Sequence, residues 1–292
     1  MPTNRTLLGS YLRARRSLVQ PEDVGLPRER NRRVEGLRRQ EVAGLADISP
    51  DYYLRLEQGR HQQPSEQVLA AIGRALRLDD DAVDYLLRIS RPVGRVTRRI
   101  AYPGPKPDDG MDCLLECWSH TPAVVIDRNQ DVVTANRLAV ALGGGHLDPG
   151  NNLVLSTFKP VVRSSADDWE DAALRAVAAL RFHSDPDDPR LREIVGSLSH
   201  RDADFRRIWA RHDARPQRSG RMRSHIDGFG FVELRFQNFS VPGHTGHTLS
   251  TFYADPDSRG AVALTRLGDR LQRSAESTPA SAMVSATMQA AG

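Results

Sequence analysis

Hydrophobic and polar residues follow two different periods along the 292-residue chain. In the first 90 residues, apolar side chains recur at intervals of three and four positions, which is the spacing of an amphipathic helix. This pattern predicts five helices, over residues 7–19, 37–47, 49–60, 64–78 and 79–90. The segment 20–36 holds prolines, glycines and arginines with few apolar residues, so we expect a long basic loop there.

The period changes after a stretch that is rich in helix breakers. Residues 91–110 carry four prolines and three glycines, which predicts a linker between domains. Beyond it, a strand–turn–strand–helix pattern covers residues 122–144, and alternation predicts further strands at 231–239 and 247–255. Amphipathic helices are expected between them, over residues 168–183, 189–200 and 202–213. Strands followed by helices and then strands predict an α+β domain with an antiparallel sheet.

The segment SPDYYLRLEQGR, residues 49–60, has the features of a short helix with an exposed polar face. Ser49 is a good N-cap, and Pro50 suits the first helical turn. Helical spacing lets Tyr53 and Leu56 share one buried face. Three side chains then point outward, namely Asp51, Tyr52 and Arg55.

Charge is unevenly distributed over a chain with a formal net charge of +4. Residues 1–99 hold 19 arginines against 13 acidic residues, a balance of +6, and the remainder holds 22 basic against 24 acidic residues, a balance of −2. A basic first third favours an anionic partner such as DNA. No apolar run approaches the ~20 residues of a membrane span. The N-terminus has no apolar signal core, and two cysteines do not form a disulfide scaffold, so we expect a cytoplasmic protein.

The segment RRQEVAGLADISPDYYLRLEQGR resembles the helix-turn-helix of the phage-repressor-like (XRE) regulators. Two short helices are joined by a tight turn that Ile48 closes, and Glu57, Gly59 and Pro64 fall at the expected spacing. The resemblance covers about residues 5–90. It implies that the exposed N-terminal face of the second helix reads base edges in the major groove, which admits one helix.

The outward residues of this motif have chemistry that suits DNA. Arg55 can form two hydrogen bonds with guanine, Asp51 can accept one from cytosine, and Pro50 offers an apolar contact. Phosphate contacts are expected from side chains that flank this face, namely Arg38, Arg39, Tyr52 and Arg60, and Ser49 begins the recognition helix. The arginines of the basic loop are candidates for phosphate or minor-groove contacts, namely Arg28, Arg30, Arg32 and Arg33. The alternative is that these arginines form a solvated surface.

Further segments resemble the MmyB-like transcription regulators of actinobacteria and some other bacteria, among them LRARRSLVQPEDVGLP, DWEDAALRAVAALR and GFGFVELRFQNF. The resemblance covers about residues 5–270 and implies an XRE domain followed by a PAS-like domain. It also implies an apolar pocket that in the family can hold a fatty acid, and a second copy of the protein as partner. The predicted fold is a two-domain α+β protein, with an all-α five-helix helix-turn-helix domain at 1–90, a linker at 91–110, a PAS-like ligand-binding domain with an antiparallel sheet at 111–272 and a mobile tail at 273–292.

An apolar ligand with a carboxylate needs an apolar cavity and a polar group near its mouth. The chain supplies aromatic residues for such a cavity, namely Trp118, Phe158, Trp169, Phe205, Trp209, Phe231 and Phe236. The candidates for the carboxylate are His212, Arg221, Arg223 and His225. The alternative for each aromatic residue is an ordinary place in the core.

Two other groups of residues have a metal-binding alternative. Cys113, Cys117 and His120 lie at helical spacing and could bind zinc or sense oxidants, but buried structural cysteines are the simpler interpretation. GHTGH, residues 243–247, could be a metal loop, but a polar hairpin turn is simpler. We therefore expect no metal and no essential cofactor, and haem or flavin would rest on fold analogy alone.

Together these features predict a sequence-specific, homodimeric DNA-binding transcriptional regulator. Its PAS-like domain would bind a fatty acid or a similar apolar molecule that modulates operator binding. The alternative is a C-terminal domain that serves only dimerisation or protein interaction. The sequence shows no phosphate loop, no nucleophile elbow and no paired carboxylates in a setting that would shift their pKa, so an enzyme is the least favoured hypothesis.

Overall fold

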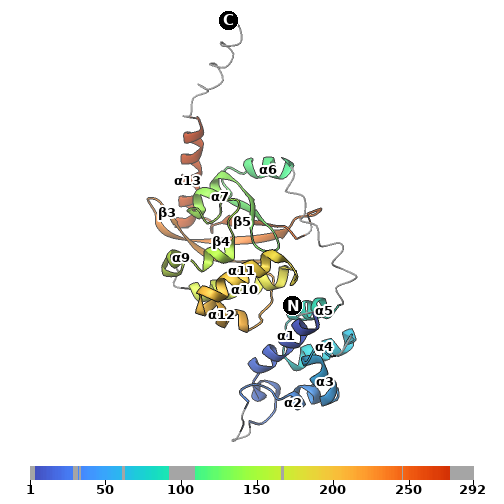
Figure 1. Ribbon diagram of the computed structural model, residues 1–292. Helices are drawn as coiled ribbons and strands as arrows, with labels where there is room; N and C mark the ends of the chain where they lie inside the picture. Colours follow the sequence, from blue (N-terminus) through green and yellow to red (C-terminus); the bar gives the residue numbers. More distant parts are fainter. Residues whose placement is uncertain are drawn as a thin grey trace. The chain divides into compact units, whose positions relative to one another are not determined.

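The computed structural model describes residues 4–28, 32, 34–60, 63–91, 109–165, 168–244 and 246–276. The predicted tail beyond residue 276 and residues 92–108 of the predicted linker lie outside these ranges. The chain forms two compact units. We call them the helical unit, Met1–Pro103 with Val154–Gln217, and the sheet unit, Gly104–Leu153 with Arg218–Gly292 (Figure 1).

The first part of the helical unit contains the five predicted helices. They are α1 (Asn4–Leu18), α2 (Arg39–Leu45), α3 (Pro50–Glu57), α4 (Glu66–Ala75) and α5 (Asp80–Ser90), and the short 3-10 helix η1 (Pro21–Val24) lies in the predicted loop. Side-chain oxygens of Ser49, Ser65 and Asp79 cap α3, α4 and α5 by accepting backbone N–H groups of the first turn. The local sequence thus determines where these helices begin.

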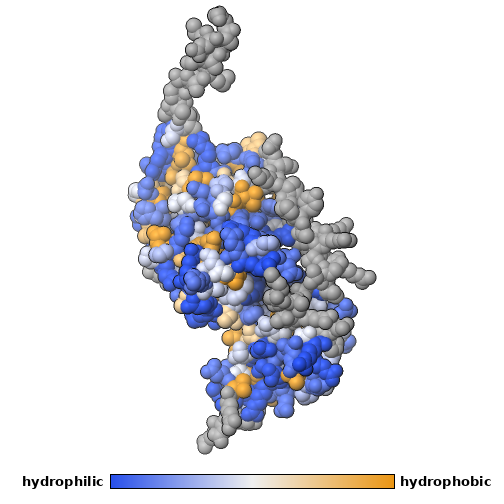
Figure 2. All heavy atoms as spheres, viewed as in Figure 1, coloured by the Kyte–Doolittle hydropathy of each residue, from blue (hydrophilic) through white to orange (hydrophobic). Residues whose placement is uncertain are grey.

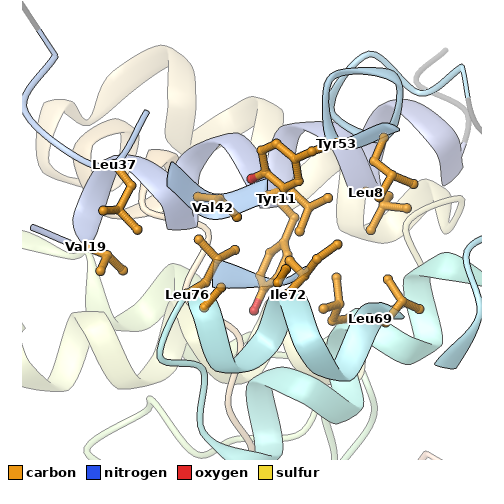
Figure 3. Close-up of a cluster of buried hydrophobic side chains, with 14 of the residues drawn as sticks. Leu8, Tyr11, Val19, Leu37, Val42, Tyr53, Leu69, Ile72 and Leu76 are labelled. Carbon is orange, nitrogen blue, oxygen red and sulfur yellow. The ribbon is translucent and has the colours of Figure 1, made fainter. Parts of the chain in front are cut away.

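One apolar core holds these five helices together, and Figure 3 shows its side chains converging between the helices. Tyr11 from α1 and Tyr53 from α3 are both completely buried in it. The two helices cross closely at Gly9, where a Cβ atom would lie 2.2 Å from the carbonyl oxygen of Glu57. The absence of a side chain at Gly9 therefore sets how closely α1 approaches α3.

The second part of the helical unit contains a separate group of helices. They are α8 (Leu153–Thr157), α9 (Pro160–Ser165), α10 (Trp169–His183), α11 (Pro189–Arg201) and α12 (Ala203–Ala210). Their apolar faces form a second core, which includes Ala173, Val177, Leu180, Leu191, Ile194, Leu198, Phe205 and Ile208. These are the faces that the helical spacing of the sequence predicts.

The sheet unit is built on five strands that are all antiparallel to their neighbours, in the order β2-β1-β5-β4-β3. The strands are β1 (Ala123–Ile126), β2 (Val132–Ala135), β3 (Ser219–Ile226), β4 (Gly230–Ser240) and β5 (Thr248–Tyr253). The helices of this unit are α6 (Asp109–Glu116), α7 (Arg137–Gly143) and α13 (Arg259–Glu276). This arrangement confirms the predicted α+β class with an antiparallel sheet.

The alternation of β4 decides which face of the sheet is covered. Val232, Leu234 and Phe236 are buried in the core that includes residues of α7 and α13. Their neighbours Phe231 and Glu233 point to the other face and are exposed. On that second face, α6 covers β1 through a small apolar cluster of Leu115, Ala123 and Val125.

Several features differ from the sequence-based expectation. The helical spacing of residues 7–19 predicts that Leu18 faces the core, but it is 41% exposed, because α1 ends there and Val19 turns inward instead. Cys113 and Cys117 are exposed free thiols and not buried residues, because they lie on the outer side of the segment that contains α6. Helices α8, α9 and α13 and the edge strand β3 were not predicted as elements.

The predicted ligand-binding domain is divided between the two units. Residues up to Leu153 and from Arg218 onward belong to the sheet unit, and residues 154–217 belong to the helical unit, which also holds the helix-turn-helix. The predicted domain bounds stay a prediction.

None of the helices in the described ranges combines the length and the apolar character that crossing a bilayer requires.

Candidate DNA-binding surface and ligand-binding residues

The exposed face of α3 lies next to its N-terminus. The Ser49 Oγ accepts the backbone N–H of Tyr52 at 3.1 Å, which fixes the first turn. Pro50, Asp51 and Arg55 are exposed, whereas Tyr53 is fully buried on the opposite side. A short helix that is anchored on one side and polar on the other can enter a major groove.

Asp51 and Arg55 form an ion pair along this face. The Arg55 Nη2 donates to the Asp51 Oδ2 one helical turn earlier. The side chains are 63% and 58% exposed, so the pair contributes only about 0.3–0.5 kcal/mol to stability. Arg55 can therefore exchange this partner for a base at little cost, and Asp51 can orient Arg55 as well as contact a base itself.

Glu57 fixes the other end of α3. Its side chain is completely buried, and its carboxylate accepts from the Arg16 Nε at 2.6 Å and from the Arg39 Nε at 2.7 Å. Burial by itself would raise the pKa of Glu57, but the hydrogen bonds from Arg16 and Arg39 outweigh it and hold the pKa below its usual value. The side chain of Arg39 stays 47% exposed, so this residue links the fold to the surface.

Arg32 of the basic loop has a structural role. Its side chain is 4% exposed, and both Nη atoms donate to the carboxylate of Glu41 in the first turn of α2. The hydrogen bond from Arg32 lowers the pKa of Glu41. This burial contradicts the phosphate contact expected of Arg32. Arg28 lies at the surface, and Arg30 and Arg33 lie outside the described residues.

The remaining predicted DNA contacts surround the exposed face of α3. Arg38 precedes α2 and is half-buried, and its backbone N–H donates to the Glu41 carboxylate at 2.6 Å. Tyr52 is half-buried, and burial raises the pKa of its hydroxyl. Arg60 is exposed just beyond α3. The phosphate contacts of Arg38, Arg39, Tyr52 and Arg60 stay predictions.

Four of the predicted ligand-binding aromatics form one cluster in the helical unit. The Phe158 ring meets Trp169 and Phe205 edge-on, at centroid distances of 5.5 and 5.3 Å. Phe205 stacks on Trp209 at 5.7 Å. The Trp169 Nε1 donates to the Thr157 carbonyl at 2.7 Å, so the polar atom of this indole is satisfied.

Two arginines lie over the tryptophans of this aromatic cluster. The guanidinium carbon of Arg163 is 4.1 Å from the Trp169 ring centroid, and that of Arg181 is 3.7 Å from the Trp209 centroid. Arg181 is 5% exposed, and burial lowers its pKa to about 10. It is still a cation at neutral pH. Arg181 is not among the predicted ligand-binding residues, although a lone arginine within the apolar stretch AALRFH indicates a functional or structural role.

His212 lies close to the same charges. Its Nδ1 is buried without a hydrogen-bond partner, and its backbone φ of 54° is left-handed. Burial, together with the nearby charges of Arg181 and Arg15, lowers the pKa of His212 to about 4. A neutral imidazole can form a hydrogen bond with a carboxylate but adds no positive charge, so Arg181 is the stronger candidate for that role.

The other predicted ligand-binding residues lie in the sheet unit. Arg221, Arg223 and His225 point outward from β3, and Phe231 is 43% exposed beside them on β4. Phe236 is buried under α7 and α13, and Trp118 packs against the small cluster below α6. The eleven predicted residues are thus divided, with Phe158, Trp169, Phe205, Trp209 and His212 in the helical unit and Trp118, Arg221, Arg223, His225, Phe231 and Phe236 in the sheet unit.

Asn136 is a structural residue outside the predicted sites. Its Oδ1 accepts the backbone N–H groups of Ala123 at 3.1 Å and Ala139 at 2.9 Å. Its Nδ2 donates to the carbonyl of Thr121 at 2.8 Å and reaches two further carbonyls before β1. This buried amide joins β1, α7 and the segment after α6.

Among the described residues, no group of three or more histidines, cysteines or acids is placed to hold a metal ion.

A buttressed, exposed α3 within a five-helix bundle, followed by an α+β region, defines a helix-turn-helix regulator with a second domain. Comparison with family models agrees on both parts: residues 7–86 match a helix-turn-helix domain, and residues 107–267 match the MmyB-like transcription regulator ligand binding domain. The chain therefore belongs to the MmyB-like transcription regulators. Its two domains are those of a ligand-responsive transcription regulator. A search of curated proteins found no match.

Proposed function

We propose that this protein binds a specific operator as a homodimer and that an apolar carboxylate, a fatty acid, changes its operator affinity. The observation that carries the proposal is the exposed face of Pro50, Asp51 and Arg55 on a helix that the buried Glu57 holds in place. Two copies of this surface would meet successive major grooves ~34 Å apart. A protein with this role acts on cytoplasmic DNA and needs no catalytic activity.

Replacing Arg55 tests the DNA part of the proposal. Arg55→Ala should weaken binding to a selected operator by about 1–3 kcal/mol and relax the preference at one base position. Arg13→Ala, which removes the same charge from an exposed position on α1, is the matched control and should change binding little. Equal losses of affinity for operator and random DNA in Arg55→Ala would mean that Arg55 contacts phosphate only.

The ligand part of the proposal is supported by the aromatic cluster with a buried cation at its edge. A fatty acid could place its chain among Phe158, Trp169 and Trp209, gaining about 0.8 kcal/mol for each buried methylene group. Arg181 would then bind the carboxylate with a charge-assisted hydrogen bond. A single antiparallel sheet with helices packed against it supports a PAS-like architecture for the ligand-binding domain.

Matched acids and alcohols test this assignment. We expect saturated fatty acids to bind with an affinity that increases with chain length. Titrations that monitor tryptophan fluorescence measure this affinity. Arg181→Gln should weaken the binding of each acid more than that of the alcohol of equal length, because only the acid loses a charge partner. Equal losses for acid and alcohol would remove Arg181 from the proposed site.

One observation favours a second candidate function. Phe158 and Phe205 are 7% and 0% exposed and pack directly on each other, which is also the arrangement of a filled core. The ligand-binding domain would then serve only dimerisation or protein interaction. Native mass spectrometry of gently purified protein distinguishes the two, because a dimer that retains no lipid and gains none on titration supports the second function.

A further inference from the structure

Within the helical unit, the five-helix bundle contacts the α8–α12 helices and the segment that follows them. Arg15 on α1 forms an ion pair with Asp213, which follows α12. The Arg215 Nη2 lies 2.7 Å from the Asp79 Oδ2, at the start of α5. Ala214 between them is 2% exposed and belongs to the apolar core of the five-helix bundle. The segment 211–215 is therefore a docking segment that reaches into the DNA-binding domain.

A second contact lies beside the docking segment. The Phe182 ring at the end of α10 lies 6.5 Å from Tyr85 of α5. Arg88 of α5 donates to the Phe182 carbonyl oxygen, and its guanidinium lies about 5 Å from both rings. Apolar, aromatic and charged contacts thus join the same two groups of helices, at positions far apart in the sequence.

The docking segment also contacts the proposed ligand site. Arg181 lies over Trp209 of the aromatic cluster and donates to the Trp209 carbonyl at 2.7 Å. The Arg181 Nη1 donates to the Asp213 carbonyl oxygen at 3.5 Å, and the backbone N–H of Arg215 donates to the Ala178 carbonyl of α10 at 3.3 Å. A continuous chain of contacts therefore leads from Trp209 through Arg181 and the docking segment to Arg15 on α1.

Docking leaves the DNA-binding surface free. Pro50, Asp51 and Arg55 remain exposed, because α3 packs on α1 through Tyr53 and Leu56 and not through the residues that meet the docking segment. The contact can therefore set the orientation of α3 without blocking the groove-facing residues. In a dimer that orientation decides whether two copies of α3 fit successive major grooves.

We propose that the docking segment transmits ligand occupancy from the aromatic cluster to the DNA-binding domain within one chain. This inference rests on the proposed function. A ligand that displaces Trp209 or engages Arg181 would move the docking segment and with it α1 and α5. The ligand can shift operator affinity only if it binds the docked and undocked arrangements differently.

Operator affinity with and without palmitic acid, measured on the full chain, tests the inference. In the wild type we expect the two dissociation constants to differ by about 5-fold or more, a typical coupling between sites. Asp213→Asn and Asp79→Asn should each bring this ratio toward one while palmitic acid itself still binds. Asparagine keeps the N-cap at position 79, because its amide oxygen can accept the same N–H.

Glu193→Gln is the matched control, since it removes one charge from an exposed ion pair on α11 and should keep the wild-type ratio. If Asp213→Asn and Asp79→Asn keep the wild-type ratio, the inference is overturned. Failure of palmitic acid to bind the wild type would instead count against the proposed ligand. Hydrogen exchange without a ligand then tests the docking contact itself. Faster amide exchange in α5 and the docking segment of Asp213→Asn than in the wild type supports the inference, and unchanged exchange overturns it.

Discussion

Glu57 is charged although its side chain has no exposed surface, because two arginines bond to it. Replacing it by Gln leaves Arg16 in a buried position without its charge partner. We expect Glu57→Gln to lower the free energy of unfolding by about 3–5 kcal/mol, the usual cost of breaking a buried pair. Asp51→Asn, which breaks an exposed pair on the same helix, should cost about 0.5 kcal/mol or less. Denaturant titrations of both variants measure the difference.

The same pair has a pH signature. The pKa of Glu57 is lowered from 4.5 in the folded protein, so its stabilisation is fully present above about pH 4.5. It is lost as the pH falls through the lower folded pKa, because the unfolded chain then binds the proton more readily. The difference in unfolding free energy between wild type and Glu57→Gln should therefore shrink on acidification. A difference that stays constant down to pH 2 would contradict this assignment.

Asn136 offers a test in the sheet unit. Asn136→Ala leaves the buried N–H groups of Ala123 and Ala139 without an acceptor, and each unsatisfied group costs about 1–3 kcal/mol. We expect marked destabilisation in thermal melts. Asn151→Ala loses one exposed hydrogen bond to the Gly145 carbonyl and is the matched control, with a cost below about 1 kcal/mol.

At the scale of elements, we expect glycine-to-alanine substitutions at two positions of the five-helix bundle to change its stability in opposite directions. Gly9→Ala places a Cβ against the Glu57 carbonyl and must push α1 away from α3, which should destabilise the bundle by about 1–3 kcal/mol. Gly44→Ala on the exposed side of α2 meets no atom within 4 Å and should stabilise it by about 0.5–1 kcal/mol. Unfolding free energies of the two variants check both signs, and a stabilising Gly9→Ala would mean that the crossing is looser than described.

Local patterns predicted most elements, because caps and helical spacing are properties of neighbouring residues. The helix of residues 49–60, with Ser49, Tyr53 and Leu56 in their expected places, is the clearest case. Strand β3 was not predicted, because its inward residues include Gly220 and Ser224 and its hydrophobic alternation is therefore weak. The strand is defined by its pairing with β4. Helix α13 was predictable too, because its apolar residues recur at helical spacing.

The candidate site was predictable only where it is local. The exposed residues of α3 follow from one short segment, and the helix-turn-helix resemblance supplied their role. The contact between Arg15 and Asp213 joins residues 198 positions apart, and no periodicity encodes such a pair. The burial of Arg32 against Glu41 was missed for a similar reason, since composition alone does not distinguish a structural arginine from a DNA-contacting one.

At the scale of the whole molecule, the surface is largely hydrophilic on the face that Figure 2 shows, and its hydrophobic residues lie in small groups. The affinity of a DNA-bound dimer should depend on the spacing between the two half-sites of the operator. We expect a shift of one half-site by about half a helical turn to abolish tight binding, and a shift by a full turn of ~34 Å to restore part of it. Gel-shift titrations with the spaced operators measure this, and indifference to spacing would indicate that each copy binds alone.

The path of the chain between the two units has a consequence for biosynthesis. The first two strands of the sheet are translated before residues 154–217, and β5, the central strand that pairs with β1, emerges only afterward. A nascent chain can form the helices of the five-helix bundle early, whereas β1 must wait more than 100 residues for β5, its second partner. Such long-range pairing is slow and leaves strand edges exposed to aggregation. We therefore expect formation of the sheet to be the slowest and most aggregation-prone step in the folding of this regulator.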